Sequence, residues 1–192
     1  MKEQESHVRA VRDPRLAIHA TSPFPAWLWS TDGTRVLWAN PIAARLFGAS
    51  SAALLQSKSF GPADPHRRQV ARMARQLSPT GAVRMERLRG FGAALGTLAT
   101  CACTRLDFPD GQEGILIVAT EPVGRPMPLV ERLRRLVVDD TQTPVAAFES
   151  DGRFVAASPA AAALLGFQTL AEAGLDDARL VALREGRVDT AF

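Results

Sequence analysis

The chain has 192 residues, of which 46% are hydrophobic, and its mean hydropathy is close to zero. These values are typical of a folded protein of one or two domains and exclude a chain that is disordered throughout. The net charge is only +3 without a long block of one sign, so the sequence pI of about 9.5 is weak support for an anionic partner. No apolar run approaches the roughly 18 residues of a membrane span, and residues 1–13 lack the apolar core of a signal peptide. We therefore expect a cytoplasmic protein with no membrane contact.

Residues 1–20 predict an N-terminal tail and one short helix. Residues 1–13 are polar, which is typical of a frayed terminus. The segment "PRLAIHA" follows and predicts a short helix, which ends before the turn-forming Pro23 and Pro25.

The stretch "AWLWSTDGTRVLWANPIAARLFG" predicts two paired strands and a helix. Asp32-Gly33 between two apolar runs is a hairpin signal, because Gly accepts a positive φ and Asp hydrogen-bonds locally. Asn40 is a preferred N-cap residue, and Pro41 suits the first helical position, where its missing N–H costs nothing. Gly48 suits the left-handed C-terminal cap, so we expect the helix to end there.

The following residues predict short helices and then three strands. "SAALLQSKSF" continues as a short helix, and "DPHRRQVARMARQL" has apolar residues at helical spacing. From Ala82 on, "AVRMERLRGF", "LGTLATCACTRLDF" and "GILIVAT" are typical of strands. Two strands that must pair with three others across a helical insertion predict an antiparallel sheet with helices on one face. Residues 21–122 are thus predicted to form one α+β domain.

Residues 123–142 predict an amphipathic linker helix. In "RPMPLVERLRRLVVDDTQTP" the apolar residues form one stripe, with Leu133 and Val137 at its centre. Arg134 and Arg135 flank the stripe as the edge charges of a coiled coil do. Three turns are too few for a stable isolated helix in water, so the stripe must pack on its own domain or on another chain.

The layout of residues 25–48 returns at residues 144–166. With one gap at Thr34, ten of the 23 aligned positions are identical. The offset of 119 residues before the gap far exceeds the roughly 20 to 50 residues of solenoid repeats, so we expect two copies of one domain; chance similarity of two Ala-rich segments is the alternative. Only 26 residues follow Gly166, so we expect residues 143–192 to be a partial second copy and the chain to be a piece of a longer protein. The identical pairs include Asp32 and Asp151, Gly33 and Gly152, Pro41 and Pro159, and Gly48 and Gly166.

The Asp-Gly turn, the apolar strand and "NPIAARLFG" resemble the opening of PAS sensor domains, and "DGQEGILIVATEP" resembles their closing half. This resemblance implies a PAS fold, with a five-stranded antiparallel sheet and short helices on one face, then a linker helix and a partial second PAS repeat. Tandem PAS domains joined by amphipathic helices are similar to the N-terminal input region of bacterial sensor histidine kinases in two-component signal transduction. In that family the corresponding helices pair in parallel, so we expect a homodimer in which Leu133 and Val137 are buried in a symmetric contact.

The sequence carries no recognisable catalytic motif. His7, His19 and His66 lie without a Ser, Cys or carboxylate motif beside them, so we expect three surface histidines. "RGFGAALG" is followed by strand-like sequence, which predicts a turn and not a phosphate-binding loop. The phosphoacceptor and nucleotide motifs of a histidine kinase core are also missing from the sequence, so we expect no catalysis by this chain.

We expect neither a cofactor nor a metal. Cys101 and Cys103 share one face of a strand, where they are poorly placed for a disulfide and too few for a zinc site, so small buried residues of a reducing compartment are expected. Some PAS domains hold haem through a histidine on a helix before the third strand, and His66 is the candidate here. Its position beside Arg67 and Arg68 predicts an exposed ring. A haem-binding sensor is nevertheless the alternative function.

An aromatic group and a basic stripe are the remaining candidates for a site. Strand alternation puts Trp27 and Trp29 on one face, where the aromatic group either lines a ligand cavity or packs against the N-terminal helix or a partner. The basic stripe predicts a solvated helix face and no nucleic-acid binding, because no recognition-helix motif accompanies it. The aromatic group is Trp27, Trp29, Trp38 and Phe47, and the stripe is Arg68, Arg72 and Arg75.

Taken together, these patterns predict a non-catalytic sensory and regulatory module. It binds a small-molecule ligand or a protein partner and biases the helical linker of a dimeric kinase, which requires different affinities for two states. The PAS input domain of a transcription regulator or of a cyclic-dinucleotide enzyme is the other class left open.

Overall fold

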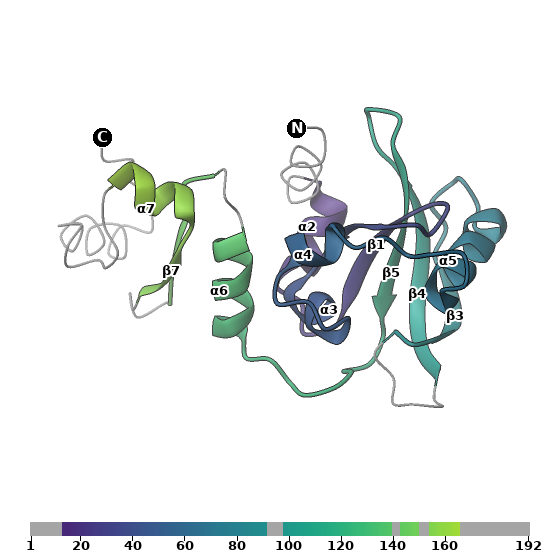
Figure 1. The fold of residues 1–192 in the computed structure, drawn as a ribbon, viewed down its shortest axis with the longest axis horizontal. Helices are drawn as coiled ribbons and strands as arrows, with labels where there is room; N and C mark the ends of the chain where they lie inside the picture. Colours follow the sequence, from purple (N-terminus) through teal and green to yellow (C-terminus); the bar gives the residue numbers. More distant parts are fainter. Residues whose placement is uncertain (1–12, 92–97, 140–142, 150–153, 166–192) are drawn as a thin grey trace. The chain divides into compact units, whose positions relative to one another are not determined.

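A five-stranded antiparallel sheet forms the centre of the first part of the chain (Figure 1). The computed structural model describes residues 13–91, 98–139, 143–149 and 154–165, and the chain divides into two units, residues 1–129 and 130–192. The spatial order of the strands is β2-β1-β5-β4-β3, so the first two strands join the last three across the helices, as expected for this α+β fold. The strands are β1 (Ala26–Ser30), β2 (Val36–Ala39), β3 (Arg84–Arg89), β4 (Leu98–Asp107) and β5 (Glu113–Ala119).

Each helix in the described part of the first unit begins with a side-chain cap. Asp13, Asn40, Ser51 and Asp64 each accept a hydrogen bond from a backbone N–H of the first turn. A proline follows the cap in three of the four helices, which explains why the starts were predictable from the sequence. The helices are α2 (Pro14–Ala20), α3 (Pro41–Leu46), α4 (Ala52–Gln56) and α5 (Pro65–Gln76).

The main core lies between one face of the sheet and the helices α3, α4 and α5. Strand alternation puts Trp27, Trp29, Cys103 and Ile117 on this face, where they pack with residues such as Val70 of α5. Leu28, Trp38 and Leu116 follow the opposite alternation and are buried as well. Helix α2 is joined to the far end of β4, since Arg15 Nη2 donates to the Asp107 carbonyl at 3.1 Å.

Two glycines have the backbone conformation that their predicted roles require. Gly33, in the turn between β1 and β2, has φ +68°, and its N–H donates to the Ser30 carbonyl. Gly48, after α3, has φ +71°, and its N–H donates to the Arg45 carbonyl, which ends the helix.

Strand β3 forms one edge of the sheet and pairs only with β4 among the described strands. Its exposed residues include Arg84, Met85, Arg87 and Arg89, whereas Leu88 points into the core. The edge of the sheet is therefore dominated by charged side chains.

The second unit repeats the opening of the first on a smaller scale. Helix α6 (Leu129–Asp139) precedes a two-stranded antiparallel sheet of β6 (Ala146–Phe148) and β7 (Phe154–Ala157), and helix α7 (Pro159–Leu165) begins at the predicted proline. The second Asp-Gly turn and Gly166 lie outside the described residues. Helix α6 ends five residues before Pro144, as α2 ends five residues before Pro25, so the repeat includes the preceding helix.

Candidate functional site

Six aromatic rings pack against one another in the core of the first unit. Trp29 lies at the centre, with ring centroids 4.6 Å from Phe60, 5.8 Å from Phe47 and 6.0 Å from Phe91. Most of the pairs are edge-to-face, the arrangement that the charge distribution of aromatic rings favours. The aromatic cluster is Trp27, Trp29, Phe47, Phe60, His66 and Phe91.

Trp38 was grouped with these residues on sequence grounds, and that grouping is wrong. Trp38 pairs with Leu28, whereas Trp27 and Trp29 point to the other face of β1. The register shift between Leu28 and Trp29 is a bulge in β2 that breaks the alternation of this strand, so Val36 lies opposite Trp29 while Trp38 lies opposite Leu28. Trp38 is fully buried on the face opposite the aromatic cluster.

His66 belongs to the aromatic cluster and is not the exposed histidine that its arginine neighbours predicted. Its side chain is 19% exposed, and its ring centroid lies 4.8 Å from that of Phe47. Its Nδ1 lies 2.9 Å from Asp64 Oδ1, and its Nε2 lies 3.0 Å from the Gly90 carbonyl oxygen. Both ring nitrogens are therefore engaged, and an iron ligand at this position would have to give up one of the two contacts.

The prediction of surface histidines is wrong for His19 too. His19 is half-buried near the end of α2, and desolvation by burial lowers its pKa. His7 lies outside the described residues. Phe60, His66 and Phe91 were missed as partners because the segments that carry them are distant in sequence, and the hairpin and capping signals do not say how α5 sits on the sheet.

Asn40 does more than cap helix α3. Its Oδ1 accepts from the N–H of Ala43 at 3.0 Å and from the N–H of Ala26 at 3.3 Å. Its Nδ2 donates to the carbonyls of Phe24 at 2.8 Å and His19 at 3.0 Å. The buried side chain thus joins the end of α2, the start of β1 and the start of α3.

Ser158 makes the equivalent contacts in the second unit. Its Oγ accepts from the N–H groups of Ala161 and Val145 and donates to the Thr143 carbonyl at 2.6 Å. Under the repeat alignment, Ala161, Val145 and Thr143 correspond to the residues that Asn40 holds in the first unit. Three equivalent bonds from non-identical side chains are strong support for two copies of one fold, and they weigh against chance similarity.

The central residues of the stripe on α6 pack within the second unit. Val137 is buried against Val155 and Ala156 of β7, and Leu133 is partly buried against the same cluster. The homodimer expected through these two residues stays a prediction, but the described structure gives both an intramolecular partner.

The two cysteines occupy the main core, as expected. Cys101 and Cys103 are free and fully buried, and desolvation by burial raises the pKa of both thiols to about 12. Within the described residues, no three His, Cys, Asp or Glu side chains are grouped so as to hold a metal ion. The helices in the described part of the chain are also too short or too polar to cross a membrane.

Comparison with known proteins gives a family match within the second unit. Residues 131–191 match the family model of the PAS domain. The match begins inside α6, so it includes most of this helix together with β6, β7 and α7. Among solved structures, the chain is similar to the PAS domain of an HTR-like protein from Haloarcula marismortui, with 16% identity and a TM-score of 0.35, covering 66% of this chain and all of that one. None of the curated proteins matches the chain.

Proposed function

Because this chain contains a PAS domain, a sensory module, we propose that it is a non-catalytic regulatory module of a two-component system. In this proposal the first unit is a PAS domain as well, and both act in the cytoplasm on a sensor histidine kinase. The observation that carries the proposal is the equivalent hydrogen bonding of Asn40 and Ser158, which supports two copies of one fold in tandem.

The position of the helices supports a regulatory role. In each unit a helix precedes the first strand. The side chain of Asn40 in the first unit, and of Ser158 in the second, is hydrogen-bonded to the segment between that helix and the strand and lies at the start of the next helix. A ligand that binds one arrangement of this junction better than another shifts the population of the two arrangements, which is the requirement for signalling. The packed aromatic cluster favours a protein partner or a ligand at the surface over a large group inside the first unit.

The homodimer forms through helix α6 in this proposal. Since Leu133 and Val137 pack within their own unit, a second copy has to use the neighbouring edge of the stripe. Leu129 and Leu136, seven residues apart, lie on that edge, and Leu129 is 51% exposed. Replacement of both by Glu should turn a dimer into a monomer in sedimentation velocity, with the far-ultraviolet circular dichroism unchanged. Wild-type protein that stays monomeric at high concentration would contradict this part of the proposal.

The regulatory role is tested with the full chain joined to the phosphoacceptor and ATP-binding regions of a histidine kinase. A series of fusions that differ by one residue at the junction should show autophosphorylation rates that rise and fall with the helical period of about 3.6 residues. The unfused chain should take up no phosphate from ATP. A flat series, or phosphorylation of the unfused chain, would argue against a non-catalytic input module.

A further inference from the structure

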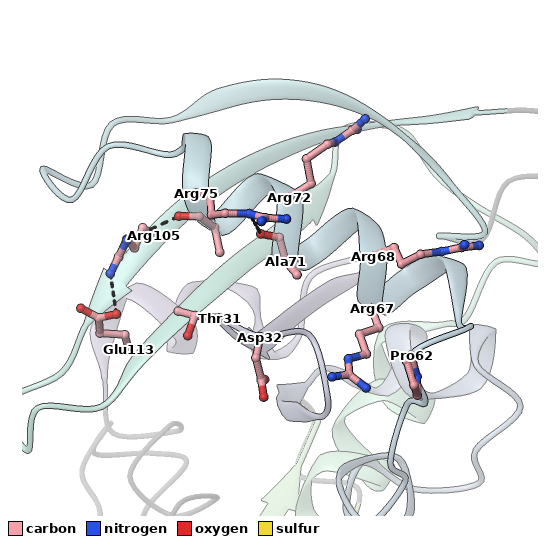
Figure 2. A pocket seen from close by; sticks show the side chains of 11 residues that line it. Thr31, Asp32, Pro62, Arg67, Arg68, Ala71, Arg72, Arg75, Arg105 and Glu113 are labelled. Carbon is pink, nitrogen blue, oxygen red and sulfur yellow. Dashed lines mark hydrogen bonds and ion pairs between the residues drawn. The ribbon is translucent and has the colours of Figure 1, made fainter.

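A groove lined by five arginines lies on the first unit, outside the aromatic cluster (Figure 2). It is shallow and largely open to solvent, with a volume of about 900 Å³. Helix α5 forms one wall, and the β1–β2 turn and the paired strands β4 and β5 supply the rest. Its basic residues are Arg67, Arg68, Arg72, Arg75 and Arg105, and its acidic residues are Asp32 and Glu113.

The positive charge of this arginine groove is only partly compensated. Arg105 is paired with Glu113, whose Oε2 lies 2.5 Å from the Arg105 Nη2. Arg75 donates only to a backbone carbonyl of its own helix, at 3.2 Å. Within the described residues, the side chains of Arg68 and Arg72 make no hydrogen bond or ion pair. The guanidinium groups of Arg68, Arg72 and Arg75 on α5 therefore have no carboxylate partner among the described residues.

The carboxylate of Asp32 does not fill this role. Its Oδ1 accepts from the Ser30 hydroxyl at 2.7 Å and from the N–H and hydroxyl of Thr34. Burial raises the pKa of Asp32, but these hydrogen bonds and the charge of Arg67 outweigh it, so the pKa lies below its usual value. The Asp32 carboxylate therefore accepts hydrogen bonds within its own turn, and the arginine whose charge acts on it is Arg67.

The walls of the arginine groove are held close together. The turn approaches α5 so closely that a Cβ on Gly33 would lie 2.6 Å from the Arg67 carbonyl oxygen. Arg105 also donates to the Ala74 carbonyl at 3.4 Å, which joins β4 to the other end of α5. These contacts fix the position of α5 against the turn and β4, and therefore the positions from which the arginine side chains extend.

The spacing of the three arginines on α5 indicates the class of ligand. Arg68, Arg72 and Arg75 follow one another at i, i+4 and i+7, so their Cα atoms span about 10 Å along the helix axis. Guanidinium groups bind phosphate through two parallel hydrogen bonds, which a single point charge does not match. Asp32 and Glu113 also line the groove, but Glu113 is paired with Arg105 and the charge of Arg67 acts on Asp32, so the uncompensated charge is that of the three arginines on α5.

We propose that the arginine groove binds a small molecule that carries two or more phosphate groups, with Arg68, Arg72 and Arg75 as the binding residues. Arg68, Arg72 and Arg75 are exposed, as the sequence predicted, and the proposal adds a ligand to this solvated helix face. The proposal stands on the groove alone and is independent of the dimer and of the kinase partner. It places a ligand-binding surface on the side of α5 that faces away from the aromatic cluster.

Isothermal titration calorimetry of the full chain tests the proposal at about 0.15 M salt, where non-specific charge attraction is screened. The probes are inorganic tripolyphosphate, ATP, orthophosphate and a single-stranded oligonucleotide. We expect tripolyphosphate and ATP to bind with one site per chain, and orthophosphate to bind at least about tenfold more weakly, because it engages fewer guanidinium groups.

A matched pair of double variants locates the site. Arg68→Ala with Arg72→Ala should weaken tripolyphosphate binding at least about tenfold. Arg87→Ala with Arg89→Ala removes the same charge from exposed positions on β3 and should leave the affinity within about twofold. Unfolding followed by tryptophan fluorescence shows whether each variant is folded.

Three results would overturn the proposal. The first is no saturable binding of tripolyphosphate or ATP. The second is an equal loss of affinity in both double variants, which would mean attraction to net charge alone. The third is an oligonucleotide that binds more tightly than tripolyphosphate and depends on Arg68 and Arg72, which would assign the arginine groove to nucleic acid.

Discussion

The contact between Gly33 and helix α5 predicts a large loss of stability when Gly33 is replaced by Ala. The residue has φ +68°, and its Cβ would lie 2.6 Å from the Arg67 carbonyl oxygen and 3.0 Å from the Arg67 Cα. Both neighbours are backbone atoms of a helix, so they cannot rotate away as the end of a side chain can. Gly48 is the matched control, because it has φ +71° and no atom lies within 4 Å of the point that an added Cβ would occupy.

The difference between the two substitutions follows from their surroundings. An L-residue in the left-handed region costs about 1–2 kcal/mol, and the stiffer unfolded chain returns about 0.4–1 kcal/mol, so Gly48→Ala should cost about 1 kcal/mol. Gly33→Ala shares this cost and adds the overpacking against Arg67, about 1–3 kcal/mol. We therefore expect Gly33→Ala to lower the free energy of unfolding by about 2–4 kcal/mol.

The assay is guanidinium unfolding followed by tryptophan fluorescence. The chain has three tryptophans, Trp27, Trp29 and Trp38, and all are buried in the first unit, so the signal reports that unit alone. Equal losses for Gly33→Ala and Gly48→Ala would refute the reasoning, because the backbone conformation would then account for the whole effect and the close approach to Arg67 for none of it.

Two further predictions concern buried polar and thiol groups. Asn40→Ala should lower the free energy of unfolding by about 2–3 kcal/mol, because four backbone groups lose a partner. Asn40→Ser should lower it by only about 1 kcal/mol or less, since Ser158 makes three of the equivalent bonds in the second unit. Equal losses for the two variants in the fluorescence assay would contradict this account. The pKa of about 12 leaves the thiols of Cys101 and Cys103 almost wholly protonated at pH 8, and burial shields them from solvent. An aromatic disulfide reagent should therefore react with them only after denaturant is added. Complete reaction of the native protein within seconds would count against both the raised pKa and the burial.

Local signals explain how much of the fold was predictable from the sequence. The helices that start at Pro41 and Pro159 and the turn at Gly33 depend on the conformations of a few neighbouring residues, and these predictions agree with the structure. The strand order follows from hairpin connections and from the need of the first strands to pair with the last.

Predictions of side-chain surroundings were less successful because they depend on packing between distant segments. His66 follows a capping aspartate and precedes two arginines, which predicts exposure, yet α5 turns the ring into the aromatic cluster. The basic stripe was visible as a pattern, but Arg105 comes from a strand about 30 residues away, so the groove itself was not. The local rule also identified Asn40 as a cap, while its bonds to His19 and Phe24 require the folded unit.

The charged edge at β3 has a consequence for the behaviour of the protein at high concentration. An unpaired strand offers free N–H and C=O groups to any other extended chain, and such edges are where sheets join into aggregates. Arg84 is paired with Glu86 at 2.7 Å, but the side chains of Arg87 and Arg89 would bring like charges together if two copies met through this edge. We therefore expect the first unit to resist sheet-to-sheet polymerisation at low salt and to lose part of this protection as added salt screens the arginines.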